Sequence, residues 1–219
     1  MVDVLEPLTS EQTEWLAQRT PERAFGKGET VYAPGDTSEV IFLLLTGSIR
    51  LYGMTAGQEL TFGVLQAGTG FGLASLMERT HDEYAMALEP SRVGMLGLND
   101  FWHLVGQNPE VNVRLVKLLG DRLRQTRSRM ADIALKETPA RLASLLLDLV
   151  QSEGVVTGEG HYKIVGHYTH EELGAMIGAK RVAVTRAFGK LQDAGGVRLF
   201  RRLIYVVDLD ALKRLASAG

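Results

Sequence analysis

Two arginines in the C-terminal third of the chain, Arg181 and Arg186, share a predicted helix with an apolar stripe. The stripe follows steps of four and three residues, so it must face a core, and it consists of Val184, Phe188 and Leu191. Both arginines fall with Val182 and Thr185 on another face. A guanidinium can bond both N7 and O6 of guanine, and a threonine methyl can pack on the methyl of thymine. This face is therefore either a solvated helix surface or a surface that recognises the edges of DNA bases.

The elements around this helix predict a winged helix-turn-helix. Two short helices are expected over residues 170–177 and 180–192, joined at Gly178, and a hairpin and a terminal helix follow them. Upstream, Pro139 starts a helix and Gly154 ends it, because proline suits the first helical turn and glycine the position after the last. A helix, a tight turn with glycine, a second helix and a trailing hairpin together form the motif.

The net charge of −2 conceals an uneven distribution of charge along the chain. Residues 1–110 carry −9 and residues 111–219 carry +7. This split is typical of a basic module that meets a polyanion, joined to an acidic module that does not, although two domains can also differ by chance. The chain has no cysteine, which excludes disulfides and thiolate chemistry and suits a reducing compartment. We see neither a signal peptide nor an apolar run of membrane-spanning length, so we expect a cytoplasmic protein.

Residues 24–100 have the pattern of many short strands. Short apolar runs alternate with glycine-containing turns, which indicates an all-β sandwich or barrel. A short helix is expected before them, over residues 8–20, with Thr9 or Ser10 as its cap. The predicted fold class is therefore α+β, with an N-terminal antiparallel β-roll or jelly roll over residues 1–107.

A long helix is predicted after Asn108 and Pro109, where the period of the apolar residues changes. Its apolar positions lie 3, 4, 3, 4 and 3 residues apart, at Val116, Leu119, Leu123, Thr126, Met130 and Ile133. This seam is narrow enough for a partner helix, and a two-stranded coiled coil explains it better than a core helix lying on the β domain. We expect a dimerisation helix over residues 108–137 and the winged helix-turn-helix over residues 138–219.

Three segments in order carry a family resemblance. The first is residues 25–52, "FGKGETVYAPGDTSEVIFLLLTGSIRLY", the second is the long seam helix, and the third is residues 168–195, "YTHEELGAMIGAKRVAVTRAFGKLQDAG". They resemble the cyclic-nucleotide-binding-type β-roll, the dimer helix and the helix-turn-helix of the CRP/FNR-type bacterial transcription regulators. The last segment is most similar to that of the global nitrogen regulators. Together the segments span nearly the entire chain.

The resemblance implies a homodimer whose two recognition helices enter successive major grooves, so that the DNA site is an inverted repeat. Arg186 aligns with the family's guanine-contacting arginine, and Arg181 with another arginine that contacts a base or a phosphate. Many relatives place a glutamate between them, where this chain has Val182, so its site preference departs from theirs. Thr185 is a further candidate for base contact. Phosphate contacts are expected from Thr169, His170, Lys180 and Lys190.

In the β-roll, the sequence departs from the family's cyclic AMP pattern. Cyclic-AMP-binding members carry a glutamate for the ribose where this chain has Leu73, and arginine-serine for the phosphate where it has Glu83 and Tyr84. Since a carboxylate repels a phosphate, we do not expect cyclic AMP to bind. The possible effector pocket consists of Gly72, Leu73, Ala74, Glu83, Tyr84, Arg122, Thr126 and Arg127.

The alternatives for the β-roll are a metabolite or no effector. Nitrogen-control members of the family bind 2-oxoglutarate, and Arg122 or Arg127 could meet such a dicarboxylate. Haem and iron–sulfur sensing are disfavoured without cysteine, and His81 alone is weak evidence for haem. The five histidines show no metal-ligand pair at i and i+4 and are expected at the surface. We therefore favour a roll with no effector or an unidentified one, and we expect no metal or cofactor.

The expected function is transcription regulation by a DNA-binding homodimer, more as an activator than as a repressor. RNA polymerase is an expected partner, because in this family it often touches the loop that corresponds to residues 157–165. The rival interpretation is a ligand-binding or enzymatic β-roll whose C-terminal module docks on protein. No Ser-His-Asp, paired-carboxylate or metal constellation is visible in the sequence, so we expect no enzymatic activity.

Overall fold

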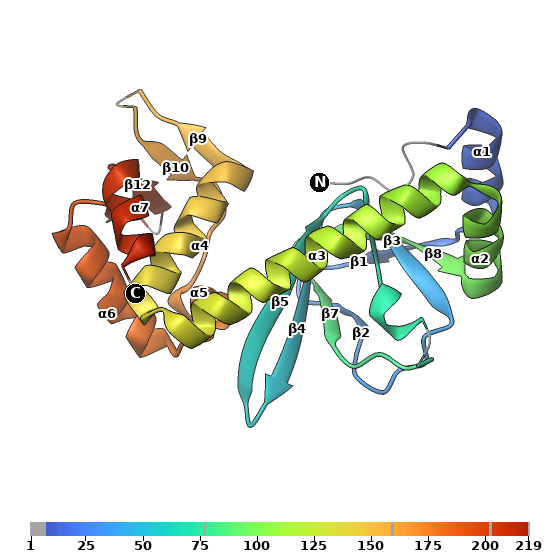
Figure 1. Cartoon of the computed structure of the whole chain (residues 1–219), viewed down its shortest axis with the longest axis horizontal. Helices are drawn as coiled ribbons and strands as arrows, with labels where there is room; N and C mark the ends of the chain where they lie inside the picture. Colours follow the sequence, from blue (N-terminus) through green and yellow to red (C-terminus); the bar gives the residue numbers. More distant parts are fainter. Residues whose placement is uncertain (1–7, 77, 159, 202, 219) are drawn as a thin grey trace. The chain divides into compact units, whose positions relative to one another are not determined.

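The computed structural model describes residues 8–76, 78–158, 160–201 and 203–218 (Figure 1). The chain divides into two compact units. The first contains residues 1–55 and 61–125, and the second contains residues 56–60 and 126–219. No helix within the described ranges is both long and apolar enough to cross a bilayer.

The first unit is built on two antiparallel sheets, as the glycine-punctuated apolar runs predict. The strand order is β1-β8-β3-β6 in one sheet and β2-β7-β4-β5 in the other. The strands are β1 (Glu22–Phe25), β2 (Thr30–Tyr32), β3 (Val40–Thr46), β4 (Ser48–Thr55), β5 (Gln58–Gln66), β6 (Thr69–Phe71), β7 (Tyr84–Ala87) and β8 (Ser91–Gly97).

The alternation of side chains along β3 supplies apolar residues to both faces of its sheet. Phe42 and Leu44 point to the core between the two sheets, while Ile41 and Leu43 pack with helices on the other face. Residues of both sheets fill the inner core: Phe25, Tyr32, Ile49, Leu51, Leu65, Phe71, Ala85, Ala87 and Val93. The first sheet is therefore apolar on both faces.

Three helices contribute to the outer core of this unit: α1 (Ser10–Arg19), α2 (Leu98–Gln107) and α3 (Pro109–Leu135). The hydroxyl of Thr9 accepts from the backbone N–H of Gln12, and the Gln12 side chain accepts from the backbone N–H of Thr9. This capping box selects Thr9, rather than Ser10, as the cap of α1. Helix α2 was not expected from the sequence, and it packs through Phe101 and Leu104.

The second unit is a winged helix-turn-helix, in agreement with the sequence prediction. Its helices are α4 (Thr138–Glu153), α5 (His170–Ile177), α6 (Arg181–Asp193) and α7 (Leu209–Ser217). One sheet has the order β11-β12-β10-β9, formed by β9 (Gly154–Val156), β10 (Tyr162–Ile164), β11 (Val197–Phe200) and β12 (Leu203–Val206). Its core combines all four helices with the sheet and includes Leu142, Leu146, Ile164, Leu173, Phe188, Leu191 and Leu212.

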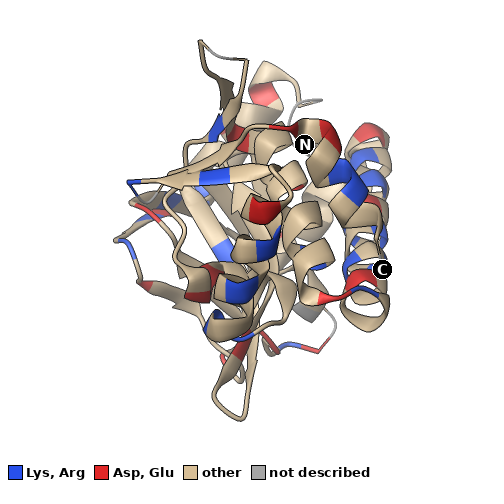
Figure 2. Cartoon of the chain, turned by 90° about the vertical axis from the view of Figure 1, so that its left-hand side faces the viewer, with Lys and Arg blue, Asp and Glu red and all other residues tan. Residues whose placement is uncertain are grey.

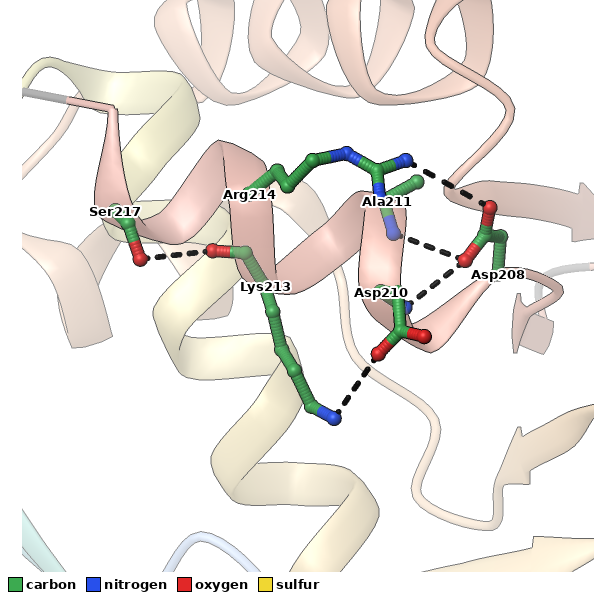
Figure 3. A network of polar contacts seen from close by, with 6 residues as sticks. All are labelled: Asp208, Asp210, Ala211, Lys213, Arg214 and Ser217. Carbon is green, nitrogen blue, oxygen red and sulfur yellow. Dashed lines mark hydrogen bonds and ion pairs between the residues drawn. The ribbon is translucent and has the colours of Figure 1, made fainter.

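Helix α7 completes this core and is held at its start by Asp208 (Figure 3). Asp208 Oδ1 accepts from the backbone N–H groups of Asp210 and Ala211, both at 2.9 Å. These bonds, with Arg214 nearby, keep the pKa of Asp208 below its usual value. Further along, Lys213 pairs with Asp210 at 3.1 Å. The terminal helix therefore begins at a defined residue, and Leu212 is held in the core.

The turn between α5 and α6 depends on two glycines. Gly178 ends α5 in the left-handed conformation, with φ +64° and ψ +42°, which costs an L side chain energy. At Gly174 a Cβ atom would clash with the backbone carbonyl oxygen of Ala179. The N–H of Ala179 donates to the carbonyl of Gly174 at 2.8 Å, so the turn lies directly against α5. This contact sets how closely the two helices approach.

We predict that Gly174→Ala destabilises the protein by about 1–3 kcal/mol, because the neighbouring atom is backbone and cannot move aside without disturbing the turn. Urea unfolding followed by circular dichroism measures the change. Gly189→Ala in α6 is the matched control, since no atom lies within 4 Å of the added Cβ. The control should leave stability unchanged or raise it by up to about 1 kcal/mol. Equal stability of the Gly174 variant and the wild type would contradict the close approach.

Candidate nucleic-acid interface

Helix α6 has two faces of opposite character. The predicted apolar stripe is confirmed, because Val184, Phe188 and Leu191 are all buried, together with Ala187. The other face is exposed and carries the candidate DNA contacts Lys180, Arg181, Val182, Thr185, Arg186 and Lys190. Because the stripe is anchored in the core, the helix cannot rotate without exposing it. The polar face is therefore held outward.

The start of α6 adds backbone donors to this exposed face. Lys180 is the N-cap, and its side chain makes no capping hydrogen bond. Arg181 and Val182 occupy the first turn, where backbone N–H groups lack helical partners and the helix dipole is positive. Such a helix end attracts anions, and helix-turn-helix proteins place these residues against base edges.

The first helix of the motif begins with a capping box that the sequence analysis did not identify. The Thr169 hydroxyl accepts from the backbone N–H of Glu172 at 3.1 Å, and the Glu172 carboxylate accepts from the backbone N–H of Thr169 at 2.7 Å. The same carboxylate accepts the hydroxyl hydrogen of Thr169 at 2.8 Å. The spacing Thr-x-x-Glu is the sequence signal for this cap. The hydroxyl of Thr169 is thus engaged within the helix end.

His170 packs between the two helices of the motif. Its Nδ1 lies 2.8 Å from the hydroxyl of Thr185 in α6. Its ring stacks on Phe188, with centroids 4.9 Å apart and an interplanar angle of 20°. Partial burial, and then the nearby Arg181 guanidinium, lower the pKa of His170, which favours the neutral ring. His170 thus bridges two elements, a contact that the sequence analysis missed.

Arg141 is a second positioning residue that the sequence analysis missed. It projects from α4, and its Nη1 donates to the carbonyl oxygen of Ile177 at 2.9 Å. This carbonyl belongs to the last turn of α5, where C=O groups lack helical partners and the dipole is negative. The guanidinium satisfies one of them and ties α5 to α4. The pair is 36 residues apart, and no local spacing signals it.

Acidic residues accompany the basic ones on the ribbon of the chain. In Figure 2, ribbon segments of Lys and Arg occur among segments of Asp and Glu. Glu171 and Glu172 lie in the first turn of α5, close in sequence to the exposed cations of the motif. The polar face of α6 itself, from Lys180 to Lys190, carries no acidic residue. A polyanion therefore meets cations and no like charge from the side chains of that face.

In the β-roll the structure brings Glu83 and Arg122 of the possible effector pocket together, with Tyr32. The Tyr32 hydroxyl donates to Glu83 Oε1 at 3.0 Å, and Arg122 Nη2 of α3 donates to the carbonyl oxygen of Gly70 at 2.6 Å. Burial raises the pKa of Glu83, and the Tyr32 hydrogen bond and the Arg122 charge partly oppose that rise. Burial likewise lowers the pKa of Arg122, which the Glu83 carboxylate opposes. The roll therefore holds a partly buried carboxyl group, that of Glu83, close to a partly buried guanidinium, that of Arg122.

The other residues of the predicted effector pocket do not join this group of contacts. Gly72 is buried in the left-handed conformation, Leu73 is buried, and Ala74 is exposed. Tyr84 stacks on Tyr52 with ring centroids 4.9 Å apart. Thr126 and Arg127 are exposed and belong to the second unit.

His81 is buried, and the expectation of a surface histidine is wrong at this position. Its ring stacks on Tyr32 with centroids 3.7 Å apart, and burial lowers its pKa. The two rings, with Phe42, line a cavity of about 290 Å³. Within the described ranges, no group of three or more His, Asp or Glu side chains is arranged to hold a metal ion. Burial at this position has no local signal, because His81 stands in a polar stretch of the sequence.

The seam of α3 is exposed along its length. Its apolar side chains Val116, Leu119, Leu123, Met130 and Ile133 are 40–70% exposed, and Thr126 is exposed as well. Single exposed apolar residues are common on protein surfaces, but five of them at heptad spacing on one helix are not. This row is the kind of surface that a second helix covers.

A β-roll and a winged helix-turn-helix with an exposed basic recognition face define a class of DNA-binding regulatory proteins. Comparison with known proteins gives the family. Residues 22–108 match the cyclic nucleotide-binding domain, and residues 140–215 match the Crp-like helix-turn-helix domain.

Relatives and solved structures agree with these matches. The chain is 30% identical over 190 residues to the cAMP-activated global transcriptional regulator Vfr of Pseudomonas aeruginosa, covering 84% of this chain and 87% of the relative. It is 28% identical to the global nitrogen regulator of a Nostoc species over 83% of each chain. A CRP/FNR family transcriptional regulator from Thermus thermophilus superimposes with a TM-score of 0.75 at 27% identity, covering 91% of this chain and 100% of that one. The chain therefore belongs to the CRP/FNR family of transcription regulators.

We predict a pH-dependent difference in stability between the wild type and Glu83→Gln. The folded state holds the Glu83 proton more tightly than the unfolded chain does, because burial raises the pKa above its ordinary value of 4.5. As pH rises above about that value, the unfolded chain releases the proton first, and the folded state of the wild type loses stability relative to it. Glutamine cannot titrate. The unfolding free energy of the wild type, relative to Glu83→Gln, should therefore fall as pH rises from acidic to neutral.

Urea titrations of both proteins at matched pH values measure this difference. At the acidic end Glu83 is protonated and resembles the amide of the variant. The difference between the two unfolding free energies should therefore be constant there and change only as pH rises. A difference that stays constant with pH would show that Glu83 titrates as it does in the unfolded chain.

Proposed function

We propose that this regulator acts as a homodimer that binds an inverted-repeat DNA site through the polar face of α6. The observation that carries the proposal is the exposed set Arg181, Thr185 and Arg186, held outward by a stripe that is fully buried on the opposite face. Arg186 contacts a guanine, and Arg181 contacts a base or a phosphate. Val182, in the first turn, replaces the polar readout that many relatives have with an apolar one.

The remaining candidate contacts supply affinity without sequence preference. Lys180 and Lys190 are exposed at the two ends of the α6 face and contact phosphates. Thr169 and His170 approach the backbone at the start of α5, where the helix N-terminus also attracts a phosphate. Both side chains already have hydrogen-bond partners in the protein, so they are held in place and contact the phosphate without a change of rotamer.

The seam of α3 supports the homodimer. An identical helix can cover the five exposed apolar side chains, and an inverted repeat presents two equivalent half-sites to a two-fold symmetric protein. Both recognition helices then face DNA together, about one helical turn apart.

We further propose that DNA binding does not require cyclic AMP. Some relatives are named as cAMP-activated and others as global nitrogen regulators. In this chain the Glu83 carboxylate stands in the roll and Arg122 already donates to Gly70. A cyclic phosphate would meet a like charge there, and a dicarboxylate such as 2-oxoglutarate would compete with Glu83 for Arg122. These contacts favour a roll that works with no effector or with an unidentified one.

Activation is proposed to use the surface formed by residues 157–165, of which Glu159 lies outside the described residues. The backbone N–H of Thr157 donates to the carbonyl of His161 at 2.8 Å, and Val165 is exposed just beyond β10. RNA polymerase is the proposed partner of this turn. The regulator acts in the cytoplasm, where the chromosome lies.

Selection of binding sites from a random duplex pool, with purified protein and no added small molecule, tests the function. We expect enrichment of an inverted repeat whose half-sites lie about one turn apart, with affinity that falls steeply as salt rises. On the selected site, Arg186→Ala should cost about 1–3 kcal/mol and leave binding to scrambled DNA nearly unchanged.

Arg186→Lys is the matched control for charge. It keeps the positive charge but loses the planar fork, so it should bind scrambled DNA like the wild type and still lose affinity for the selected site. If Arg186→Ala lost affinity equally for selected and scrambled DNA, Arg186 would contact a phosphate and not a base. Enrichment only after cyclic AMP or 2-oxoglutarate is added would contradict the proposal for the roll.

The homodimer is tested by Leu123→Lys at the centre of the seam. Leu123 is 61% exposed, so the variant keeps its fold but places two like charges at the contact. Light scattering should report a particle of about twice the 24.0 kDa chain for the wild type and a single chain for the variant. Ser128→Lys, exposed on the side of α3 away from the seam, should stay dimeric. A wild-type monomer at micromolar concentration would refute the dimer.

A further inference from the structure

We propose that His170 is a positioning residue that fixes Thr185, so that Thr185 recognises a thymine through its methyl group and not through its hydroxyl. This inference rests on the proposed function, because it concerns the DNA-facing side of α6. It assigns the side chain at the start of α5 a part in base selectivity beyond any contact with phosphate.

The hydrogen-bond geometry determines the direction of each bond. The Thr185 hydroxyl donates to the carbonyl oxygen of Arg181, one turn earlier in α6, at 3.1 Å. A hydroxyl has a single hydrogen, so toward His170 Nδ1, 2.8 Å away, it can only accept. Both contacts hold together only if Nδ1 carries a proton. His170 is therefore the donor, whether its ring is neutral or charged.

The imidazole that makes this bond is held in place from two sides. Its ring stacks on Phe188, which is 1% exposed and belongs to the core of the second unit. Its backbone follows the Thr169 cap, which the Glu172 carboxylate closes on both the N–H and the hydroxyl. A donor fixed by the core and by a helix cap leaves the Thr185 side chain a single favourable orientation.

The consequence concerns which atoms of Thr185 remain for DNA. A free threonine hydroxyl can donate to or accept from many base edges, so it discriminates poorly. Here its hydrogen is used by Arg181 and one of its lone pairs by His170. The methyl group takes part in neither hydrogen bond, and it belongs to an exposed side chain between Arg181 and Arg186. The apolar partner for a methyl in the major groove is the C5-methyl of thymine.

The test removes that one methyl group from the DNA. The probe is the inverted repeat recovered by selection, with each thymine replaced in turn by deoxyuridine at the symmetric positions of both half-sites. For the wild type we expect one position at which the substitution weakens binding by about fourfold per half-site, the effect of one buried methyl-sized group. Elsewhere the substitution should have little effect.

Variants then assign the effect to the pair. Thr185→Ser keeps the hydroxyl and lacks the methyl, so it should bind thymine and deoxyuridine sites equally. His170→Ala frees the hydroxyl and should reduce the discrimination at the same position. In the His170→Ala background, Thr185→Val should restore it, because a β-branched side chain without a hydroxyl has one favoured rotamer in a helix. His167→Ala, at an exposed histidine outside the motif, is the control and should behave as the wild type.

The outcomes separate this inference from the proposed function. If the wild type enriches no DNA sequence, both are overturned. If it binds its site specifically but tolerates deoxyuridine everywhere, or if His170→Ala keeps full discrimination, only this inference is overturned. A loss in His170→Ala that Thr185→Val does not restore would show that His170 supports the fold of the motif and not the orientation of Thr185.

Discussion

The burial of one stripe of α6 is the constraint on which the site depends. Val184, Ala187, Phe188 and Leu191 are each at most 1% exposed, and they anchor the helix among α4, α5 and the sheet. Because an α-helix is rigid, fixing one face in a core also fixes the opposite face in space. The positions of the polar residues of α6 therefore follow from the buried stripe, while Thr185 is held in addition by its hydrogen bonds with His170 and Arg181. Phe188 does more, since its ring also supports His170.

The β-roll follows a different principle, in which polar groups inside the domain supply each other's partners. Tyr32 of β2, Glu83 just before β7, Gly70 of β6 and Arg122 of α3 meet there, and their contacts satisfy an acid and a base that burial would otherwise penalise. Glu83, one of the positions at which the sequence departs from the cyclic AMP pattern, is thus held within the roll by contacts of the chain itself.

Much of this architecture could be predicted from the sequence, and the exceptions have physical reasons. Periodicity located the buried stripe of α6, the seam of α3 and the strands of the roll, because each depends on residues close in sequence. Helix α2 was missed because its ten residues follow an apolar strand without a polar cap, Gly97 being its N-cap. His81 looked exposed in its polar surroundings. The bonds of His170 with Thr185 and of Arg141 with Ile177 join separate helices, so they depend on tertiary packing that no local spacing signals.

If the exposed seam of α3 pairs as proposed, it also determines how the regulator would respond to its own abundance. In the proposed homodimer each chain supplies one half of a symmetric interface, so where dimers are the minor species their concentration rises with the square of the concentration of chains. A two-half-site operator that accepts only dimers would then fill steeply over a narrow range of expression. Transcription of the target gene would then switch at a threshold concentration of the protein, which its synthesis and dilution set. The polar Thr126 in the middle of the seam would raise that threshold by weakening the pairing of the helices.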